Sequence, residues 1–399
     1  MTRTILHIDL NNFYASVECL YNPQLRNIPL AVAGDPANRH GIILAKNMAA
    51  KKLGIKTGEA IWQAKQKAPS LVCVPPQFDK YLRFSRAARA IYSRYTNQIE
   101  SFGIDECWLD VTASKNIFGS GSSIAESIRK SVKRELGLTV SIGLSWNKIF
   151  AKLGSDYKKI VWSLPVTDLL YVGRSTGKKL MDRAIFTIGD LAARDPKLLE
   201  LQLGKWGLIL SSFARGEDTM PVKHIDERYS IKSIGNSTTT PRDLVSLQDV
   251  KLVFICLAES VAARLRENGL KCNGVEISLR STDLSTISRQ MKLSAACFNS
   301  SDILAAALQL FNNNYIFQPR KALRSVGIRG IDLVAADSGI QLSLFDPDNG
   351  QKNKLAATID TLRRRFGHNA IFRASCLCDP ELTKLNPKDD HVIHPVSFF

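Results

Sequence analysis

Residues 4–10 read TILHIDL, and residues 98–112 read QIESFGIDECWLDVT. The first stretch is a short apolar run that ends near an acidic residue, which predicts a buried strand at Thr4–Leu10 with Asp9 close to its tip. The second predicts two strands, near Gln98–Ile104 and Cys107–Thr112, that flank an acidic turn at Asp105-Glu106. If these strands are neighbours in one sheet, the three acidic side chains converge on one edge.

The segments around these strands have helical periodicity. Apolar residues recur at helical spacing from Tyr81 to Tyr95 and from Ile124 to Leu136, and a further strand is predicted at Leu138–Gly143. The order strand, helix, hairpin, helix, strand is that of a split βαβ sheet of ferredoxin-like type, with helices on one face. Residues 11–76 then form a separate excursion after the first strand.

The pattern of predicted elements changes twice in the rest of the chain. From about Leu164, short helical segments punctuated by glycine predict a small α domain. Residues 231–335 contain a long helical pattern, predicted strands and another helix, which together predict a second α+β domain. Beyond Asp337 we expect a tail with a possible short helix at Leu355–Phe366.

The net charge of +17 over 399 residues indicates a polyanionic partner. Residues 1–159 contain 23 Lys and Arg against 12 Asp and Glu, and residues 231–335 contain 13 against 8. Two basic blocks joined by a nearly neutral one suggest a clamp around a polyanion, whereas the alternative is an ordinary solvated basic surface. A chain of this length is expected to form two to four domains.

Composition also predicts a cytoplasmic protein without a membrane segment. The chain has no apolar run of about 18 residues, and no signal-peptide core precedes Asp9. The eight cysteines are scattered and are expected to be reduced thiols. Only Cys376 and Cys378, with His391 and His394 downstream, hint at a metal, and their spacing does not match the usual zinc patterns.

The acidic centre favours hard divalent cations. Convergent carboxylates repel one another and are tolerated when cations lie among them, and two such ions about 3.5–4 Å apart serve in-line phosphoryl transfer. Oxygen ligands with few histidines nearby favour Mg²⁺ over zinc. The competing interpretation is that Asp105 and Glu106 are merely surface turn residues, because acidic turns are common.

Two long motifs then resemble one family. Residues 7–18, HIDLNNFYASVE, resemble the opening motif of the Y-family translesion DNA polymerases, and residues 101–110, SFGIDECWLD, are similar to that family's second motif. The resemblance covers roughly residues 1–345. It implies an α+β right-hand polymerase with a ferredoxin-like palm (1–10 and 78–159), small fingers (11–77), a helical thumb (160–230), an α+β little finger (231–335) and a tail (336–399).

The resemblance implies an activity and its partners. The expected function is template-directed, low-fidelity DNA synthesis across damaged DNA by a monomer, with primer-template DNA and dNTPs as partners. By motif position, Asp9, Asp105 and Glu106 are the catalytic acids that hold two Mg²⁺ ions, with the Leu10 carbonyl as an additional ligand. Many relatives have a second aspartate where this chain has Asn11.

The resemblance also implies contacts to the incoming nucleotide. Tyr14 occupies the steric-gate position, where an aromatic ring collides with a 2′-hydroxyl, and Phe13 is its packing neighbour. Without the motif, these aromatics would be read as ordinary core residues. Lys51 and Lys159 lie where the family directs cations toward the triphosphate, although each could be an ordinary solvated lysine; Met48 replaces a tyrosine of many relatives.

Three further segments are expected to contact DNA or a partner protein. Residues 172–180, VGRSTGKKL, resemble a helix-hairpin-helix in which Gly173, Arg174 and Thr176 grip a phosphate. Residues 341–345, QLSLF, are similar to the peptide that docks on the bacterial sliding clamp (its beta subunit) through Gln341, Leu342, Leu344 and Phe345; the alternative is a hydrophobic staple back onto the domain. The strands of the little finger carry the remaining candidates for the DNA backbone: Arg280, Arg289, Lys292, Arg324 and Arg329.

One departure from the family defines an alternative function. Lys159 runs almost directly into residues 160–165, IVWSLP, so around fifteen family-typical residues of the palm are missing. The second hypothesis is therefore a catalytically impaired protein that binds DNA and the sliding clamp. A nucleotide cyclase on a similar palm is disfavoured, because it explains neither the helix-hairpin-helix nor the basic second domain.

Overall fold

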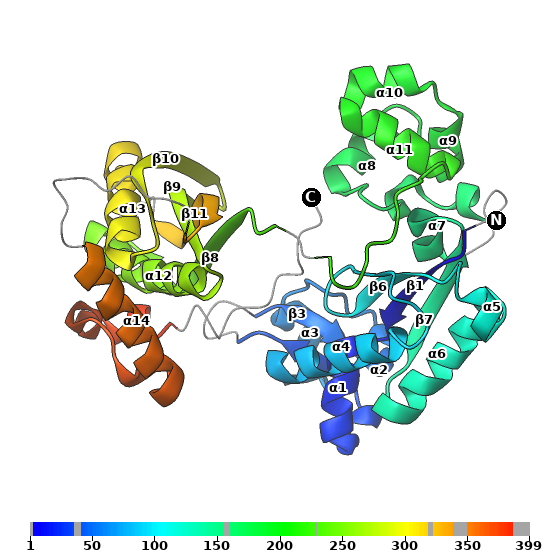
Figure 1. Cartoon of the computed structure of the whole chain (residues 1–399), viewed down its shortest axis with the longest axis horizontal. Coiled ribbons are helices and arrows are strands. Elements are labelled where there is room, and N and C mark those ends of the chain that lie inside the picture. The colour runs from blue at the N-terminus through cyan, green and yellow to red at the C-terminus, as the bar shows by residue number, and fades with distance from the viewer. Residues whose placement is uncertain are drawn as a thin grey trace. The chain divides into compact units, whose positions relative to one another are not determined.

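The computed structural model describes residues 3–35, 41–154, 160–227, 230–317, 322–337 and 349–385 (Figure 1). The chain divides into two compact units. The first comprises Met1–Gly34 and Ile42–Arg228, and the second is built on Tyr229–Val392. Each unit has hydrophobic cores of its own.

The central sheet of the first unit is ferredoxin-like, as the sequence predicts. Its four strands lie in the order β5-β6-β1-β7. β1 (Ile5–Leu10) pairs antiparallel with β6 (Glu106–Asp110) and with β7 (Val140–Ser145). β5 (Ile99–Ser101) forms the edge beyond β6.

The alternation of residues along β1 separates the two faces of this sheet. Leu6, Ile8 and Leu10 are buried in a core with α1 (Phe13–Tyr21), α4 (Phe78–Tyr92) and α6 (Gly121–Leu136), which lie on one face (Figure 1). Each such side chain contributes roughly 1.5–3 kcal/mol to folding by leaving water. Ile5, His7 and Asp9 therefore point to the opposite face. There the smaller core around Ile5 includes Trp108 of β6 and Ala151 of α7 (Lys148–Leu153).

Residues 11–77 contain a second, three-stranded sheet and several helices. β2 (Leu30–Ala33) pairs antiparallel with β3 (Ile43–Lys46) and parallel with β4 (Val72–Val74). The side chain of Asn47 accepts a hydrogen bond from the Ala50 amide (2.9 Å) and caps the first turn of α2. The helices here are η1 (Pro23–Asn27), α2 (Met48–Lys52) and α3 (Ile61–Lys67).

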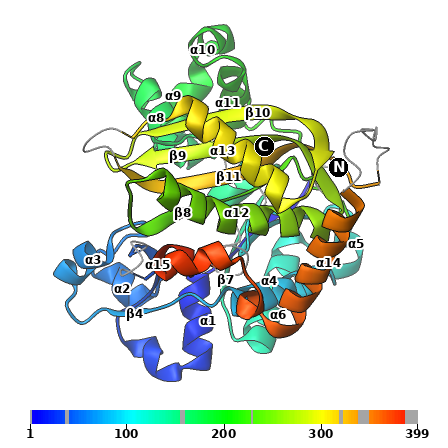
Figure 2. The same cartoon turned by 90° about the vertical axis from the view of Figure 1, so that its left-hand side faces the viewer.

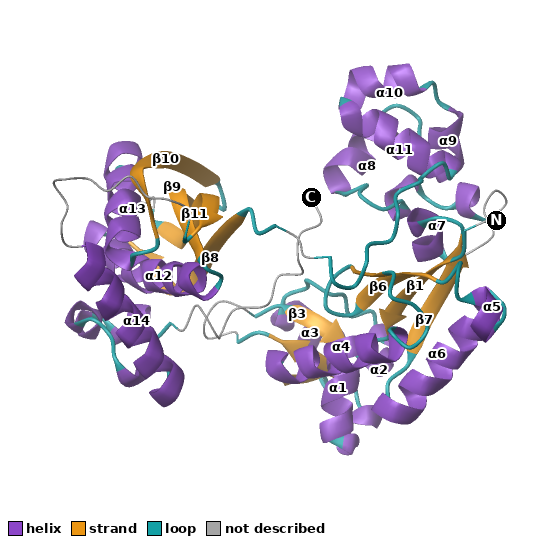
Figure 3. Cartoon of the chain, viewed as in Figure 1, coloured by secondary structure: helices purple, strands orange, loops and turns teal. Residues whose placement is uncertain are grey.

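Residues 161–215 form a helical region with its own core (Figure 3). Val161 is fully buried in that core, together with Ile149 and Phe150 of α7 (Lys148–Leu153). The helices are η2 (Val161–Ser163), η3 (Val166–Asp168), α8 (Arg174–Met181), α9 (Ile188–Ala193), α10 (Pro196–Leu203) and α11 (Lys205–Arg215).

The second unit is a four-stranded antiparallel sheet in the order β10-β9-β11-β8, covered on one face by two helices (Figure 2). Its core is formed where α12 and α13 pack on the inward residues of the strands, among them Val275 and Ile328. The strands are β8 (Ser233–Leu244), β9 (Leu270–Ser281), β10 (Thr286–Cys297) and β11 (Leu323–Ala335), and the helices are α12 (Leu247–Glu267) and α13 (Ser300–Asn314).

The expectation of a tail after residue 336 is wrong for residues 349–385, which fold onto the second unit. α14 (Asn349–Phe366) is followed by η4 (His368–Ala370), η5 (Ala374–Cys378) and α15 (Pro380–Thr383). Leu382 is fully buried in the core of the second unit. Arg266 of α12 binds Asp360 of α14 through two hydrogen bonds of 2.6 and 2.8 Å. Charged side chains of this segment are thus paired with residues of the second unit.

Candidate active site

Asp9 and Glu106 lie opposite one another at the end of the central strand pair. Their Cα atoms are register partners in the antiparallel ladder between β1 and β6. Directly opposite residues project to the same face of a sheet, so the two carboxylates share the face that α4 and α6 leave uncovered. Asp105 immediately precedes β6, and its carbonyl accepts a hydrogen bond from the Leu10 amide (3.2 Å). The three predicted acidic residues are thus brought to one end of the sheet.

The turn that carries Asp105 is held by α4. Arg89 donates to the Gly103 carbonyl (2.7 Å), and the Ser85 hydroxyl donates to the Ile104 carbonyl. Gly103 has a φ of +100°, a backbone conformation that favours glycine over other residues. Sequence reasoning did not single out Arg89, because an arginine on an amphipathic helix ordinarily indicates a solvent-facing position.

Burial and mutual repulsion disfavour negative charge on two of the acids. Burial raises the pKa of Asp9 to about 6, with further contributions from the neighbouring charges of Glu106 and Asp105. Burial, followed by the charge of Glu106, also raises the pKa of Asp105. A site that keeps these acids together therefore favours the binding of a cation among them.

Glu106 is stabilised in its charged form by two partners that the sequence analysis did not assign. Its Oε2 lies 3.0 Å from His7 Nε2 and accepts a hydrogen bond from the Lys152 ammonium. Burial alone would raise the pKa of Glu106, but the hydrogen bonds from His7 and Lys152 outweigh it and lower the pKa. Burial lowers the pKa of His7, which favours a neutral imidazole. The one available signal for Lys152 is its place in the otherwise largely apolar segment of α7.

A glycine allows α7 to approach the sheet closely enough for this contact. Gly143 of β7 is the register partner of His7. A Cβ atom at Gly143 would lie 2.0 Å from the Ala151 carbonyl oxygen and 2.9 Å from the Cα of Gly154. Any side chain at this position would push α7 away from the sheet, and Lys152 would move with it.

The donor set of the three acids suits Mg²⁺, although their side chains are not arranged around an ion. Among the described residues, no group of three or more His, Cys, Asp or Glu side chains is positioned to hold a metal. Carboxylate oxygens are the ligands that Mg²⁺ prefers, and burial, followed by the charges of Glu106 and Asp105, raises the pKa of Asp9. The Lys152 ammonium occupies one side of Glu106.

Asn11, which follows β1, is hydrogen-bonded to Ser141 of β7 and to Thr139 just before it. Its side-chain amide donates to the Thr139 hydroxyl (3.2 Å), and its Oδ1 accepts a hydrogen bond from the Ser141 hydroxyl (2.7 Å). An amide can donate and accept in this way, whereas an ionised carboxylate can only accept. The amide therefore has a structural role here that does not require a metal.

Tyr14 lies beside the acidic centre at the start of α1. The helix begins after Asn12, whose left-handed backbone (φ 50°) turns the chain sharply at the end of β1. The Tyr14 ring stacks on Tyr81 at 4.3 Å with an interplanar angle of 9°, and Phe13 contacts it at 5.6 Å. Burial, together with the charge of Asp105, raises the pKa of Tyr14 to about 12. Tyr14 is thus half-buried next to Asp105.

The other residues of the first unit that the sequence predicts to bind nucleotide or DNA are not in contact with the acidic centre among the described residues. Lys51 is exposed in the last turn of α2, and no hydrogen bond or ion pair joins its side chain to the acidic centre in the described part of the chain. Gly173 and Arg174 are exposed at the start of α8, and Thr176 is half-buried in its first turn. Lys159 lies outside the described residues. So does the predicted clamp peptide formed by Gln341, Leu342, Leu344 and Phe345.

The five predicted cations of the second unit do not share one face. Exposed Arg280, Lys292 and Arg329 lie at register positions that point away from α12 and α13. Arg289 lies on the edge strand β10, opposite the buried Ile277 of β9. This register position faces α12 and α13. Arg324 falls at the irregularity between Leu323 and Ser325 and is half-buried. Only tertiary pairing reveals this difference, because all five look alike in the sequence.

Comparisons with known proteins agree with this fold and with one another. The model of the impB/mucB/samB family matches residues 8–156, and that of its C-terminal domain matches residues 231–344. A chimeric Y-family DNA polymerase has a similar fold, with a TM-score of 0.72 and 24% identity over 83% of this chain and 99% of that chain. The fold is therefore that of a Y-family polymerase.

The sequence relatives narrow the class further. The chain is 49% identical to the DNA polymerase IV of Acetivibrio thermocellus over 96% of this chain and the whole of that protein. It is 36% identical to DNA polymerase IV 1 of Bacillus subtilis over 94% of both chains. It is 33% identical to DNA polymerase IV of Clostridium acetobutylicum over 94% of this chain and 99% of that protein. The chain belongs to the DNA polymerase IV family of Y-family polymerases.

None of the helices among the described residues combines the length and the hydropathy that a bilayer span requires.

Proposed function

We propose that this chain is a DNA-directed DNA polymerase that extends primers across damaged templates. The observation that carries the proposal is the register of Asp9 with Glu106, next to Asp105, in a chain of the DNA polymerase IV family. Primer-template DNA and dNTPs are the substrates. The surplus of Lys and Arg in the sequence supports a polyanionic partner.

Asp9, Asp105 and Glu106, with the Leu10 carbonyl, would hold two Mg²⁺ ions. Ions bound in this way stabilise the attacking and departing oxygens of an in-line phosphoryl transfer. The chain itself supplies the orientation: the β1–β6 register fixes Asp9 against Glu106, and Arg89 fixes the turn of Asp105. Positioning of the primer 3′-hydroxyl and the α-phosphate by template pairing converts the reaction into an effectively unimolecular step.

Other residues would select and hold the substrates. Tyr14, with Phe13 behind it, would exclude the 2′-hydroxyl of ribonucleotides, and Lys51 and Lys159 would offset charge on the triphosphate. Amides at the start of α8 would contact a DNA phosphate. Residues 341–345 would dock on the sliding clamp, and we propose a monomer acting in the cytoplasm. In the second unit, the contacts to the DNA backbone would come from Arg280, Lys292 and Arg329, together with Arg289 and Arg324.

Primer extension opposite an abasic site, with Mg²⁺ or with EDTA, tests the proposal. We expect Mg²⁺-dependent extension by the wild-type chain and its loss in the variant with Asp105→Asn and Glu106→Gln, while DNA binding stays nearly unchanged. Glu126→Gln, an acid on α6 whose side chain is 45% exposed and pairs with Arg129, is the matched control and should extend normally. Folded wild-type protein that binds DNA and the clamp but incorporates no nucleotide would instead support the catalytically impaired alternative.

A further inference from the structure

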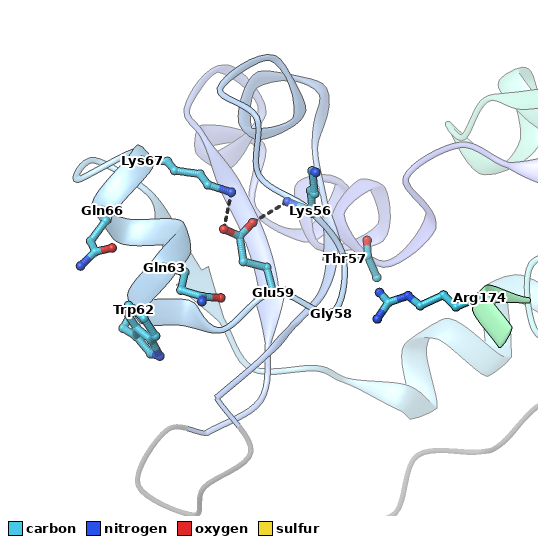
Figure 4. A pocket seen from close by; sticks show the side chains of 9 residues that line it. All are labelled: Lys56, Thr57, Gly58, Glu59, Trp62, Gln63, Gln66, Lys67 and Arg174. Atoms are coloured by element: carbon cyan, nitrogen blue, oxygen red, sulfur yellow. Dashed lines mark hydrogen bonds and ion pairs between the residues drawn. The ribbon is translucent and has the colours of Figure 1, made fainter. Parts of the chain in front are cut away.

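A pocket of about 570 Å³ lies between the loop before α3, α3 itself and the first residue of α8, and none of the three acids lines it (Figure 4). All of these elements belong to the first unit. Its aromatic lining residue is Trp62, and its cationic lining residues are Lys56, Lys67 and Arg174. In Figure 4, Trp62 and Arg174 lie at opposite sides of the pocket.

The Trp62 side chain is not buried in the core. On α3, Ile61 and Ala64 are buried in the small core of this region, whereas Trp62 remains 62% exposed. Gln66, four residues further along the helix, is exposed on the same face. Within the described part of the chain, no other aromatic ring or cation packs on the Trp62 indole. A large ring exposed on a charged surface loses the free energy of burial, which favours a ligand that covers it.

The single acid of the pocket is already neutralised. Glu59 accepts hydrogen bonds from Lys67 Nζ (2.5 Å) and from the Lys56 amide (2.8 Å). The hydrogen bond from Lys67 is the main cause that lowers the pKa of Glu59, so this carboxylate stays charged and paired. The ammonium of Lys56 and the guanidinium of Arg174 have no ion-pair partner among the described residues. The pocket therefore presents two available cations and one open aromatic face.

This combination selects the class of ligand. Pockets for small metabolites are lined mainly by apolar side chains, whereas this one is lined by charges, glutamines and one indole. An aromatic ring beside cations that follow a phosphate backbone is the arrangement with which proteins bind single-stranded nucleic acid. The interior bases of a duplex are covered on both sides by their neighbours, so an indole face can stack only on a base that is unpaired or terminal.

We propose that Trp62 stacks on an unpaired base of the template strand, while Lys56 and Arg174 contact the adjacent phosphates. This inference rests on the proposed polymerase function, which supplies a template with a single-stranded 5′ overhang. Trp62 is then a positioning residue that holds the template strand before it is copied, and it does not touch the reacting atoms.

The test measures how the affinity for DNA depends on the length of the template overhang. A fixed, dye-labelled duplex with 5′ overhangs of zero to eight nucleotides is titrated with the full-length protein. Stacking of one base is worth about 1–3 kcal/mol, or roughly 5- to 150-fold in affinity. We expect Trp62→Ala to remove at least about 5-fold of the affinity that the overhang adds and to leave blunt-duplex affinity unchanged. Trp62→Phe should restore most of this loss, because it keeps an aromatic face.

Matched controls separate stacking from general damage. Phe186→Ala removes another exposed aromatic (58% exposed) of the first unit and should behave as wild type. Arg174→Gln and Lys56→Gln should each lower the salt dependence of overhang binding by about 0.7 in the logarithmic slope, the value for one phosphate contact on a single strand. Since Trp62 is exposed, Trp62→Ala is expected to fold, and its thermal unfolding midpoint verifies this.

Free dNTP is the other ligand that offers a base and phosphates to this pocket. A titration of the protein with dNTP in the absence of DNA distinguishes dNTP binding from template binding. Loss of dNTP affinity in Trp62→Ala with unchanged overhang dependence would overturn the inference. Equal losses on blunt and overhung duplexes would overturn it as well. Primer extension by the wild-type chain on an undamaged template reports separately on the proposed function, so the two ideas can fail independently.

Discussion

Asp9 and Glu106 are direct cross-strand partners, and their carboxylates occupy the same face of the palm sheet. Like charges that are directly opposite in a sheet are destabilising. The arrangement is kept although burial and these neighbours raise the pKa of Asp9 to about 6. Lys152 relieves part of the repulsion through its contact with Glu106. The repulsion between Asp9 and Glu106 should therefore lower the free energy of unfolding of the metal-free protein.

Asp9→Asn is expected to stabilise the metal-free protein while it abolishes primer extension. A pKa that is higher in the folded state than in the unfolded state means that the charged carboxylate destabilises the fold at neutral pH, and this penalty disappears as the pH falls below about 4. After allowance for solvent screening, we expect a gain of about 1 kcal/mol at pH 7.5 in EDTA. Urea unfolding measures it, and an unchanged or lower stability would contradict the electrostatic argument.

Lys152→Met is expected to make the protein more dependent on Mg²⁺. Loss of a hydrogen bond to a charged group costs about 1.5–3 kcal/mol, so the variant should unfold at a lower temperature in EDTA. Added Mg²⁺ should then raise its unfolding temperature more than it raises that of the wild type. Lys130→Met, an exposed lysine on α6, is the control and should show the wild-type response. An identical Mg²⁺ effect in all three proteins would argue against a role for Lys152 at the metal site.

The buried ion pair between Lys148 and Glu100 should be costly to break from one side only. Lys148 Nζ lies 2.9 Å from Glu100 Oε2, and the two side chains are 8% and 6% exposed. Lys148→Met leaves an uncompensated buried carboxylate and should cost about 3–5 kcal/mol in urea unfolding. The double variant Lys148→Met with Glu100→Leu should recover much of this loss. If the double variant is no more stable than Lys148→Met, the pair is not the source of the destabilisation.

Tyr14→Ala should admit ribonucleotides, whereas Tyr14→Phe should not. The ring of Tyr14 is held by its stacking on Tyr81, and a phenylalanine ring can occupy the same position. We expect the ratio of rNTP to dNTP incorporation to rise at least about tenfold for alanine, equivalent to about 1.4 kcal/mol, and to change little for phenylalanine. Single-nucleotide insertion assays measure both ratios. Unchanged sugar selectivity in Tyr14→Ala would remove Tyr14 from the proposed role.

Residues 349–385, which fold onto the second unit, should contribute to its stability through Leu382. This side chain is fully buried in the main core, whereas Leu377 of the same segment is 62% exposed. Leu382→Ala should cost about 2–5 kcal/mol, and Leu377→Ala should change stability by less than about 0.5 kcal/mol. Denaturant unfolding of the full chain measures both. Equal effects of the two substitutions would show that residues 349–385 do not pack as described.

Local patterns in the sequence were sufficient for the palm. A short apolar strand followed by Asp9 and an acidic turn between two strands are readable within a few residues, because strand alternation decides which side chains share a face. The resemblance to Y-family polymerases, confirmed by the relatives, extended these patterns to the fold class. Lys51, Lys159 and the clamp peptide stay predictions, since no described contact tests them.

Tertiary structure alone decided which charges meet. Lys152 reaches Glu106 across 46 residues of sequence, and Arg266 reaches Asp360 across 94. Nothing local distinguishes these side chains from solvated lysines, arginines and aspartates, because the interaction that stabilises each one comes from a distant element. The same reason explains why residues 349–385 read as a tail and why Arg289 could not be separated from Arg280. The sequence determined the elements and the acids at their ends, and the packing of α7, α12 and α14 determined the partners of those charges.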